Sequence, residues 1–299
     1  MEPEEWCKMK DYSVYPETGT IYSGTERKYE ILIDGYRYIV KVQSHSESGL
    51  LYNHVSEYLG SHIFQSVNIP VQETVLGTYR GLHAVILKSF LQEREALIPF
   101  NGISESTLEQ DKELYQDSYE DIITILENNR KSTDVQETTD RFWDMFIVDA
   151  LIGNFDRHGG NWDFIKKEGR YAMATVYDNS SCLYPRLNTD EQIEKVLADQ
   201  AEIDKRVYTF PTSHIKHNGR KSSYFEIINS LQYEQCNLAL LRIMERLDMK
   251  KIDDIVDSVP EISQLRNHFY KLMLKTRCEK ILLPSYCRLC AQQRKGKIL

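Results

Sequence analysis

The stretch G-N-F-D-R-H-G-G-N-W at residues 153–162 decides how the rest of this sequence is interpreted. It directly follows residues 138–152, which are apolar on nearly every face of a predicted helix and are therefore expected to lie in a core. Asp156 and Asn161 stand five residues apart, and two glycines between them allow the backbone a tight loop. The pattern predicts a polar loop held at the end of a buried helix.

Asp156 and Asn161 carry side chains that phosphoryl transfer needs. A carboxylate on such a loop can hold an acceptor hydroxyl and accept its proton, and the amide oxygen can bind Mg²⁺. Asp178 follows a predicted strand at residues 174–177 and is expected to be the second metal ligand. His158, inside the loop, fits either a structural role or a contact to phosphate. ATP and Mg²⁺ are the cofactors that these residues predict.

A hairpin near the N-terminus carries a lysine that can bind phosphate. Residues 29–33 and 36–42 alternate between apolar and polar side chains around Asp34-Gly35, the strongest short signal for a β-hairpin. Lys41 is expected near the end of the second strand. A lysine at such a position can neutralise the α- and β-phosphates of a nucleotide if a carboxylate holds it in place.

The next helix supplies that carboxylate. Residues 51–63 place apolar side chains at helical spacing, and Asn68-Ile69-Pro70 ends the pattern. Glu57 is the candidate partner of Lys41. It lies off the apolar stripe, so it is expected to face a cleft or solvent rather than the core. Glu47 is the alternative partner.

Residues 21–28, I-Y-S-G-T-E-R-K, precede the hairpin and are the candidate for a loop that covers the phosphates. Ser23 and Thr25 are possible donors on either side of Gly24, and one glycine alone is a weak signal. The loop is a candidate because it directly precedes the hairpin that carries Lys41. These features stand in the order that kinases require: a lysine on a strand, a glutamate on a helix, an apolar helix, a loop with an aspartate and an asparagine, and a later aspartate.

The remaining pattern predicts an α+β fold with two lobes, similar to that of protein kinases. Residues 1–90 would form a small β-rich N-lobe with one main helix, and residues 91–299 a larger, mostly helical C-lobe that carries the catalytic and metal-binding loops. The further predicted elements are strands near 73–77 and 82–87, a hairpin at 164–176 that turns at Glu168-Gly169, and helices at 108–128, 138–152, 224–231, 236–247, 252–259 and 262–283.

Composition excludes several other classes of protein. The chain of 299 residues has a formal net charge of −8, which argues against a surface that grips nucleic acid. The N-terminus, M-E-P-E-E-W, lacks the basic start and apolar core of a secretory signal. No apolar run is long enough to span a bilayer. We therefore expect a soluble, cytoplasmic protein.

The six cysteines suggest no disulfide framework. Cys287 and Cys290 form one C-x-x-C pair with Cys278 upstream, but a structural zinc site usually needs a fourth ligand at matching spacing. Reduced thiols are the favoured interpretation.

At these residues the chain resembles the HipA-like kinases, which are bacterial serine/threonine kinases, and in particular their compact CtkA type. The motifs that carry the resemblance are N-F-D-R-H-G-G-N-W at 154–162 and V-Y-D-N-S-S at 176–181, supported by Y-I-V-K at 38–41, V-S-E-Y-L-G-S at 55–61 and V-I-L-K-S-F at 85–90. It covers nearly the whole chain.

The resemblance implies a role for each matched position. Asp156 matches the catalytic aspartate, Asn161 and Asp178 the magnesium ligands, and Lys41 with Glu57 the phosphate-binding lysine and its partner. Three further residues, Lys88, Ser89 and Phe90, match the hinge whose backbone binds adenine, and Ser23 matches a region of autophosphorylation. The implied partners are a protein with a serine or threonine hydroxyl and an antitoxin-like regulator.

The sequence also departs from ordinary protein kinases. No His-Arg-Asp precedes the loop, Asp178 begins Asp-Asn-Ser rather than Asp-Phe-Gly, and no Ala-Pro-Glu occurs after it. The Asp-Arg-His string is similar to that of phosphoinositide kinases, so a lipid or small-molecule kinase is an alternative. A third hypothesis is a nucleotide-binding protein without catalytic activity.

Overall fold

A four-stranded antiparallel sheet forms the N-terminal part of the molecule. The computed structural model describes residues 9–20, 27–47, 49–92, 94–100, 119–128, 134–158, 160–217, 220–260 and 262–296. The sheet has the strand order β1 (Lys28–Ile33), β2 (Tyr36–Val42), β6 (Leu82–Lys88), β5 (Thr74–Tyr79). The predicted hairpin is confirmed, because Ile33 pairs with Tyr36 across Asp34 and Gly35, whose φ angles of 50° and 82° suit a tight turn.

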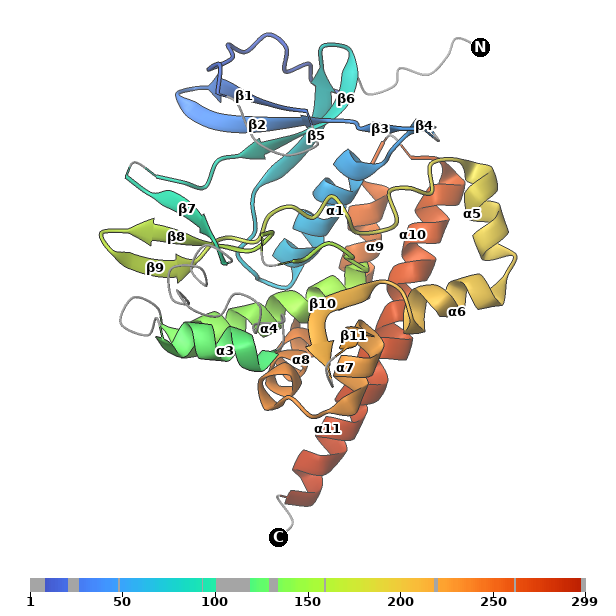
Figure 1. Cartoon of the computed structure of the whole chain (residues 1–299). Coiled ribbons are helices and arrows are strands. Elements are labelled where there is room, and N and C mark those ends of the chain that lie inside the picture. The colour runs from blue at the N-terminus through green and yellow to red at the C-terminus, as the bar shows by residue number, and fades with distance from the viewer. Residues whose placement is uncertain are drawn as a thin grey trace.

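The helix α1 (Asn53–Ser66) packs between this sheet and the rest of the molecule (Figure 1). Two short strands, β3 (His45–Ser46) and β4 (Gly49–Leu50), precede it. The prediction that this segment is a helix is confirmed, and Asn68, with a φ of 60°, lies just beyond its end. Helix α1 is buried on nearly every face, so both the sheet and the helical part contribute to its environment.

A second, three-stranded sheet extends from the helical part. It consists of β7 (Ala96–Pro99), β8 (Asp163–Lys167) and β9 (Arg170–Met173). The predicted turn at Glu168-Gly169 is confirmed, whereas β7 was not predicted.

The predicted strand at residues 174–177 is wrong. Within it only Val176 forms a bridge, to Val71. Arg141 donates to the carbonyls of Met173 and Ala174 at 2.5 and 2.8 Å, so these carbonyls bind a side chain rather than a neighbouring strand.

Helices make up most of the remaining chain. The confirmed ones include α4 (Val135–Ile152), α7 (Tyr224–Ser230), α8 (Glu234–Arg246) and α9 (Met249–Asp257). Of the predicted helix at 108–128, α3 (Tyr119–Asn128) is described and residues 108–118 lie outside the described residues. Besides β3, β4 and β7, the elements that the sequence did not predict include α5 (Asp190–Leu197), α6 (Gln200–Tyr208), β10 (Thr212–His217) and β11 (Arg220–Ser223).

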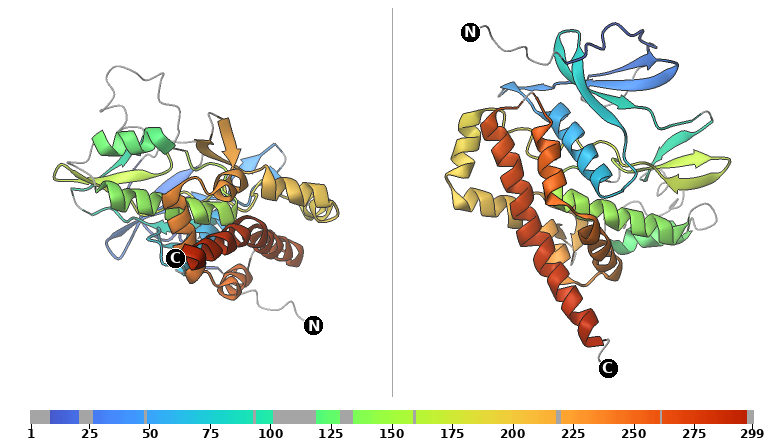
Figure 2. Two further views of the ribbon diagram at one scale, coloured as in Figure 1. Left: turned by 90° about the horizontal axis from the view of Figure 1, so that it is seen from below. Right: turned by 180° about the vertical axis from the view of Figure 1, so that it is seen from behind.

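The last predicted helix is longer than expected. It comprises α10 (Gln264–Arg277), a π-helical segment η1 (Cys278–Leu282) and α11 (Leu283–Gly296), which together run along the back of the molecule (Figure 2). One large apolar core joins α1, α4 and these C-terminal helices. The predicted α+β fold with a β-rich N-terminal part and a helical remainder is thus confirmed, and within the described ranges no helix has the length and apolarity to cross a membrane.

Candidate active site

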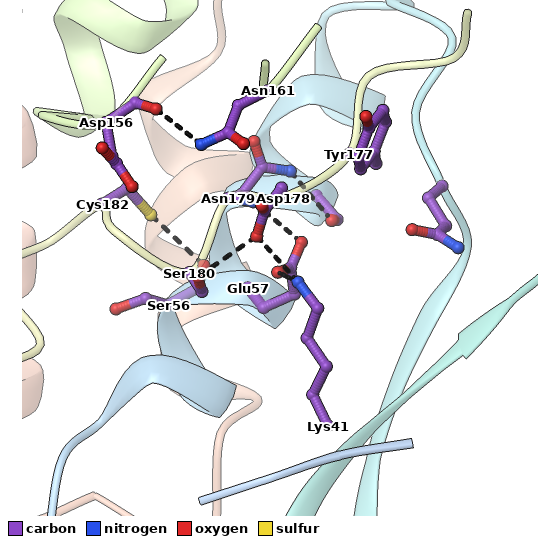
Figure 3. A network of polar contacts seen from close by, with 12 residues as sticks. Lys41, Ser56, Glu57, Asp156, Asn161, Tyr177, Asp178, Asn179, Ser180 and Cys182 are labelled. Atoms are coloured by element: carbon purple, nitrogen blue, oxygen red, sulfur yellow. Dashed lines mark hydrogen bonds and ion pairs between the residues drawn. The ribbon is translucent and has the colours of Figure 1, made fainter. Parts of the chain in front are cut away.

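Lys41 is held between two carboxylates. Its Nζ atom lies 2.7 Å from Oε2 of Glu57 and 2.8 Å from Oδ1 of Asp178 (Figure 3). The prediction that Glu57 faces a cleft or solvent is wrong, because this side chain is fully buried. The face of α1 opposite the apolar stripe is covered by the loop that begins at Asp178. Glu47, the alternative partner, is exposed in the turn between β3 and β4.

The loop after Asp178 sits directly on α1. The backbone N–H of the buried Asn179 donates to Oε1 of Glu57 at 2.8 Å, and its side chain donates to Ser61 Oγ at 3.2 Å. A Cβ atom at Gly60 would stand 2.6 Å from the Cβ of Asn179, a separation that real Cβ contacts essentially never reach. Gly60 is therefore the residue that lets the loop come close enough for Asp178 to meet Lys41.

Asp178 is ionised and conformationally unusual. Burial alone would raise its pKa, but the charge and hydrogen bond of Lys41 outweigh burial and hold the pKa at about 2. Its φ of 57° lies in the left-handed region, which a residue other than glycine seldom adopts without support from its surroundings. The site thus presents a fixed, negatively charged carboxylate.

The loop at 153–162 is built on the C-terminal end of α4. Gly153 caps the helix with a φ of 65°. Asn154 donates to Oδ1 of Asp149 at 3.0 Å and accepts from the N–H of Asp156 at 3.1 Å. The Nδ2 of Asn161 donates to the Asp156 carbonyl at 2.7 Å, so the amide oxygen of Asn161 points away from that bond and is available as a ligand (Figure 3). The Asp156 carboxylate itself is half-exposed.

Arg157 ties this loop to its surroundings. It contacts Asp149 through Nε at 2.9 Å and Nη2 at 3.2 Å, the carbonyls of Asn161 and Tyr177 through Nη1 at 2.9 and 2.6 Å, and Asn179 Oδ1 through Nη2 at 2.6 Å. All five N–H donors of the guanidinium are used. Although burial disfavours its charge, the Asp149 carboxylate raises the pKa of Arg157 above its ordinary value.

His158 lies beside the carboxylate of Asp156. Its Nε2 is 3.9 Å from Asp156 Oδ1, and the ring is partly exposed. The N–H of Gly160 donates to Nδ1 at 3.0 Å, which favours the tautomer with the proton on Nε2, the nitrogen nearer Asp156. This geometry supports a role for His158 at the acceptor side of the loop.

A cleft of about 1560 Å³ opens next to Lys41 and Asp178. Ile39 and Leu87 line it, and so do Lys88, Ser89, Phe90 and Tyr177. The predicted hinge therefore faces the cleft. The N–H groups of Lys88 and Ser89 already bond to the carbonyls of Glu73 and Arg37, at 3.0 and 2.9 Å. Adenine would therefore have to meet the backbone further along, at the Ser89 carbonyl and the Phe90 N–H. Of the predicted phosphate loop at residues 21–28, residues 21–26, with Ser23, Gly24 and Thr25, lie outside the described residues.

Several residues of the site escaped the sequence analysis. Two of them stood in stretches that the sequence had already marked. Asp149 is a polar residue inside the apolar run at 138–152, and Asn179 lies inside the motif V-Y-D-N-S-S at 176–181. Asp163 is buried, and burial raises the pKa of its carboxyl to about 6. Oδ1 of Asp163 lacks a hydrogen-bond partner among the described residues, whereas the carboxyl group as a whole forms a hydrogen bond with the Tyr177 side chain.

The donor set fits a hard divalent cation. An ionised carboxylate at Asp178 and the amide oxygen of Asn161 are oxygen ligands, and Mg²⁺ commonly takes one or two protein ligands and keeps several waters. In the described part of the chain, no group of three or more His, Cys, Asp or Glu side chains could hold a metal. The five cysteines described there, Cys287 and Cys290 included, are free thiols.

Comparisons with known proteins place these features in context. The sequence profile of the HipA-like C-terminal domain matches residues 20–258. The chain is 35% identical over 251 residues to the serine/threonine-protein kinase CtkA of Helicobacter pylori, covering 83% of this chain and 77% of that protein.

Two solved structures are similar to the whole fold. The crystal structure of the Helicobacter pylori proinflammatory kinase CtkA matches with a TM-score of 0.86 and 31% identity, over 95% of this chain and 99% of that one. HipA of Shewanella oneidensis, solved with HipB and operator DNA, matches with a TM-score of 0.58 over 92% of this chain and 68% of that one. At 14% identity the second match concerns the fold alone.

Proposed function

The chain belongs to the HipA-like C-terminal domain family, and we propose that it is a serine/threonine protein kinase that transfers the γ-phosphate of ATP to a protein hydroxyl. The observation that carries the proposal is the position of Lys41, bonded at once to Glu57 on α1 and to Asp178 beside the cleft. A kinase needs a lysine in this place, fixed by a helix carboxylate, because the nucleotide phosphates must be neutralised and held still.

The nucleotide would bind in the cleft with its base toward the hinge. The Ser89 carbonyl and the Phe90 N–H would take the adenine edge, and Ile39 and Leu87 would cover its faces. Lys41 would then exchange its bond to Asp178 for bonds to the α- and β-phosphates while Glu57 keeps its position. Asn161 and Asp178 would hold Mg²⁺, which when bound supplies positive charge across the phosphate oxygens.

Asp156 would act on the acceptor. Its backbone is fixed through Asn154 and Asn161, whereas its carboxylate is half-exposed and can reach an incoming hydroxyl. As the hydroxyl oxygen bonds to the γ-phosphorus and the bond to ADP breaks, the hydroxyl proton passes to Asp156. His158, close to the same carboxylate, is a candidate contact for the transferred phosphate.

The test is transfer of label from γ-³²P-ATP in the presence of Mg²⁺. The reactions contain the chain alone, a generic basic protein, or phosphoinositide vesicles, each with wild type, Asp156→Asn and Asp254→Asn. Asp254 is an exposed aspartate on α9 and serves as the matched control. Label on serine or threonine with wild type and Asp254→Asn, absent with Asp156→Asn and with EDTA, is the expected result. Label confined to lipid would refute the proposed acceptor.

Three finer predictions of the resemblance accompany this proposal. Autophosphorylation at Ser23 would appear as a phosphorylated peptide containing residue 23 when the labelled chain is digested. An antitoxin-like protein regulator would copurify with the chain from its native cells, and a cytoplasmic location would place both in the soluble fraction of the lysate.

A further inference from the structure

Two aromatic rings form a surface next to Asp156. Phe155 directly precedes Asp156 in the loop, and its ring stacks on that of Phe210, with centroids 6.0 Å apart and planes inclined by 29°. Phe210 lies between α6 and β10, and 41% of its surface is exposed. No part of the phosphate-transfer chemistry described above uses either ring.

A guanidinium lies over one of these rings, that of Phe155. The Arg186 Cζ atom is 5.8 Å from the centroid of the Phe155 ring, and Arg186 is exposed. Among the described residues, the partner found for the Arg186 side chain is the Phe155 ring, and no ion pair is found for it. The surface therefore combines exposed aromatic area with a positive charge that is free to meet an acidic group.

A buried arginine lies near this surface, because it contacts Tyr184, whose ring centroid is 6.5 Å from that of Phe210. Arg277, which is 1% exposed, donates to the carbonyl of Ala150 at 2.7 Å, to the Tyr184 hydroxyl at 3.5 Å and to the carbonyl of Arg206. Each of these partners is neutral, and Arg277 Nη2 has no hydrogen-bond partner within the described part of the chain. The carbonyls of Ala150 and Arg206 lie in the last turns of α4 and α6, whose C-terminal dipoles partly offset the charge of Arg277, so Arg186 carries the positive charge of the surface itself.

We propose that Phe155, Phe210 and Arg186 form the acceptor-side surface, and that it selects a polypeptide with a bulky apolar side chain and an acidic residue close to the serine or threonine. This inference rests on the proposed kinase function and adds the sequence class of its substrate. The surface adjoins Asp156 because Phe155 is the residue directly before it in the chain. An extended peptide advances about 3.3 Å per residue, so side chains within a few positions of the acceptor hydroxyl can reach both rings.

The chemistry of the surface favours a peptide over a lipid headgroup. Recognition of a phosphoinositide headgroup relies on clustered lysines and arginines that meet several phosphates. Here one exposed guanidinium lies over one ring of a stacked aromatic pair, a combination suited to one apolar and one acidic side chain.

The experiment uses the full chain and a panel of synthetic peptides with one central serine. Each of the three positions on either side of the serine is set in turn to Ala, Leu, Phe, Asp or Lys. Wild type is compared with Phe210→Ala and Arg186→Glu. The matched controls are Leu238→Ala, 42% exposed on α8, and Arg170→Glu, exposed at the start of β9. The KM for peptide and the KM for MgATP are measured separately.

Wild type should prefer Leu or Phe at one flanking position and Asp at another. Phe210→Ala should lower kcat/KM for the apolar-flanked peptide roughly ten- to a hundredfold, and Arg186→Glu should reverse the preference from Asp to Lys. The loss in Phe210→Ala and the changed preference in Arg186→Glu should both appear in the KM for peptide and not in the KM for MgATP. Both control variants should match wild type.

The contrary results are distinct. Peptides labelled without any flanking preference, or variants indistinguishable from their controls, would overturn the inference and leave the proposed kinase function standing. Labelling of the chain itself with no labelled peptide would do the same. Transfer to phosphoinositide vesicles alone, or to no protein at all, would overturn both.

Discussion

Replacing Arg157 with methionine should separate the stability of the active site from its catalytic geometry. Five hydrogen bonds join this buried guanidinium to Asp149, to the carbonyls of Asn161 and Tyr177, and to the side chain of Asn179. The two bonds to Asp149 balance the charge of the guanidinium. The other three connect the loop carrying Asn161 with the one that continues into Asn179, so they fix how the two candidate metal ligands lie relative to each other.

The expected cost depends on the burial of the pair. The Arg157 and Asp149 side chains are 6% and 1% exposed, so Arg157→Met leaves an uncompensated carboxylate in the core. Breaking a buried pair in this way typically costs about 3–5 kcal/mol. A domain's total stability is about 5–15 kcal/mol, so the variant should fold with a much lower urea midpoint.

A second substitution tests the cause. Asp149→Asn in the Arg157→Met background removes the stranded charge and keeps an acceptor for Asn154, whose Nδ2 lies 3.0 Å from Asp149 Oδ1. The double variant should therefore recover about 1–3 kcal/mol relative to Arg157→Met. Its phosphate transfer should stay at least about a hundredfold below wild type, because the two loops still lack their common donor.

Urea unfolding monitored by circular dichroism gives the stabilities, and γ-³²P transfer gives the activities. Arg157→Met with a stability within about 1 kcal/mol of wild type would contradict the burial argument. Recovery of full activity in the double variant would contradict the claim that Arg157 positions the loops.

Three further substitutions address the contact between α1 and the loop after β9. Gly60→Ala places a Cβ 2.6 Å from that of Asn179 and should lower kcat about a hundredfold with a destabilisation of about 1–3 kcal/mol; wild-type kcat in steady-state assays would refute the close-contact argument. Lys41→Met leaves the buried Glu57 without its cation and should lower the unfolding free energy by about 3–5 kcal/mol and weaken ATP binding; calorimetry that finds the wild-type affinity would exclude Lys41 from the phosphates. The pKa of Asp178 is depressed from 3.8 to about 2, so its stabilising contribution, about 2 kcal/mol, is present at neutral pH and lost as pH falls through that range. The stability gap between wild type and Asp178→Asn should therefore close in acid, and a gap independent of pH would show that Lys41 does not depress this pKa.

The local parts of the fold were predictable because their signals are local. Asp34-Gly35 needs only its own backbone preferences to turn a hairpin, and the spacing of apolar residues in α1 and α4 is visible in a short window. Short polar helices offer weaker signals. Helix α5 has a capping box in which Thr189 and Gln192 satisfy each other's backbone N–H groups, but its eight residues bury only Ile193 and Val196.

The environment of Glu57 could not be predicted from helical spacing. A residue off the apolar stripe is normally exposed, and the exception depends on a loop more than a hundred residues away that covers α1. The glycine at position 60 makes that covering possible, yet a lone glycine inside a helical pattern indicates only some local weakness. Long-range packing therefore determined the part of the site that the sequence analysis described wrongly.

The position of Asp178 depends on how the loop that follows it packs against buried side chains of α10. After Asp178 the loop runs back over α1, and two buried arginines of α10 hold its further part. Arg266 donates to the Leu187 carbonyl at 2.6 Å, and Arg277 contacts the Tyr184 hydroxyl at 3.5 Å. Both arginines are fully enclosed, so moving this loop would expose or strand their charges at considerable cost. In a kinase without Ala-Pro-Glu or Asp-Phe-Gly, packing against α10 can therefore maintain the orientation of the Asp178 carboxylate, the candidate metal ligand, without a phosphate added to a flexible loop.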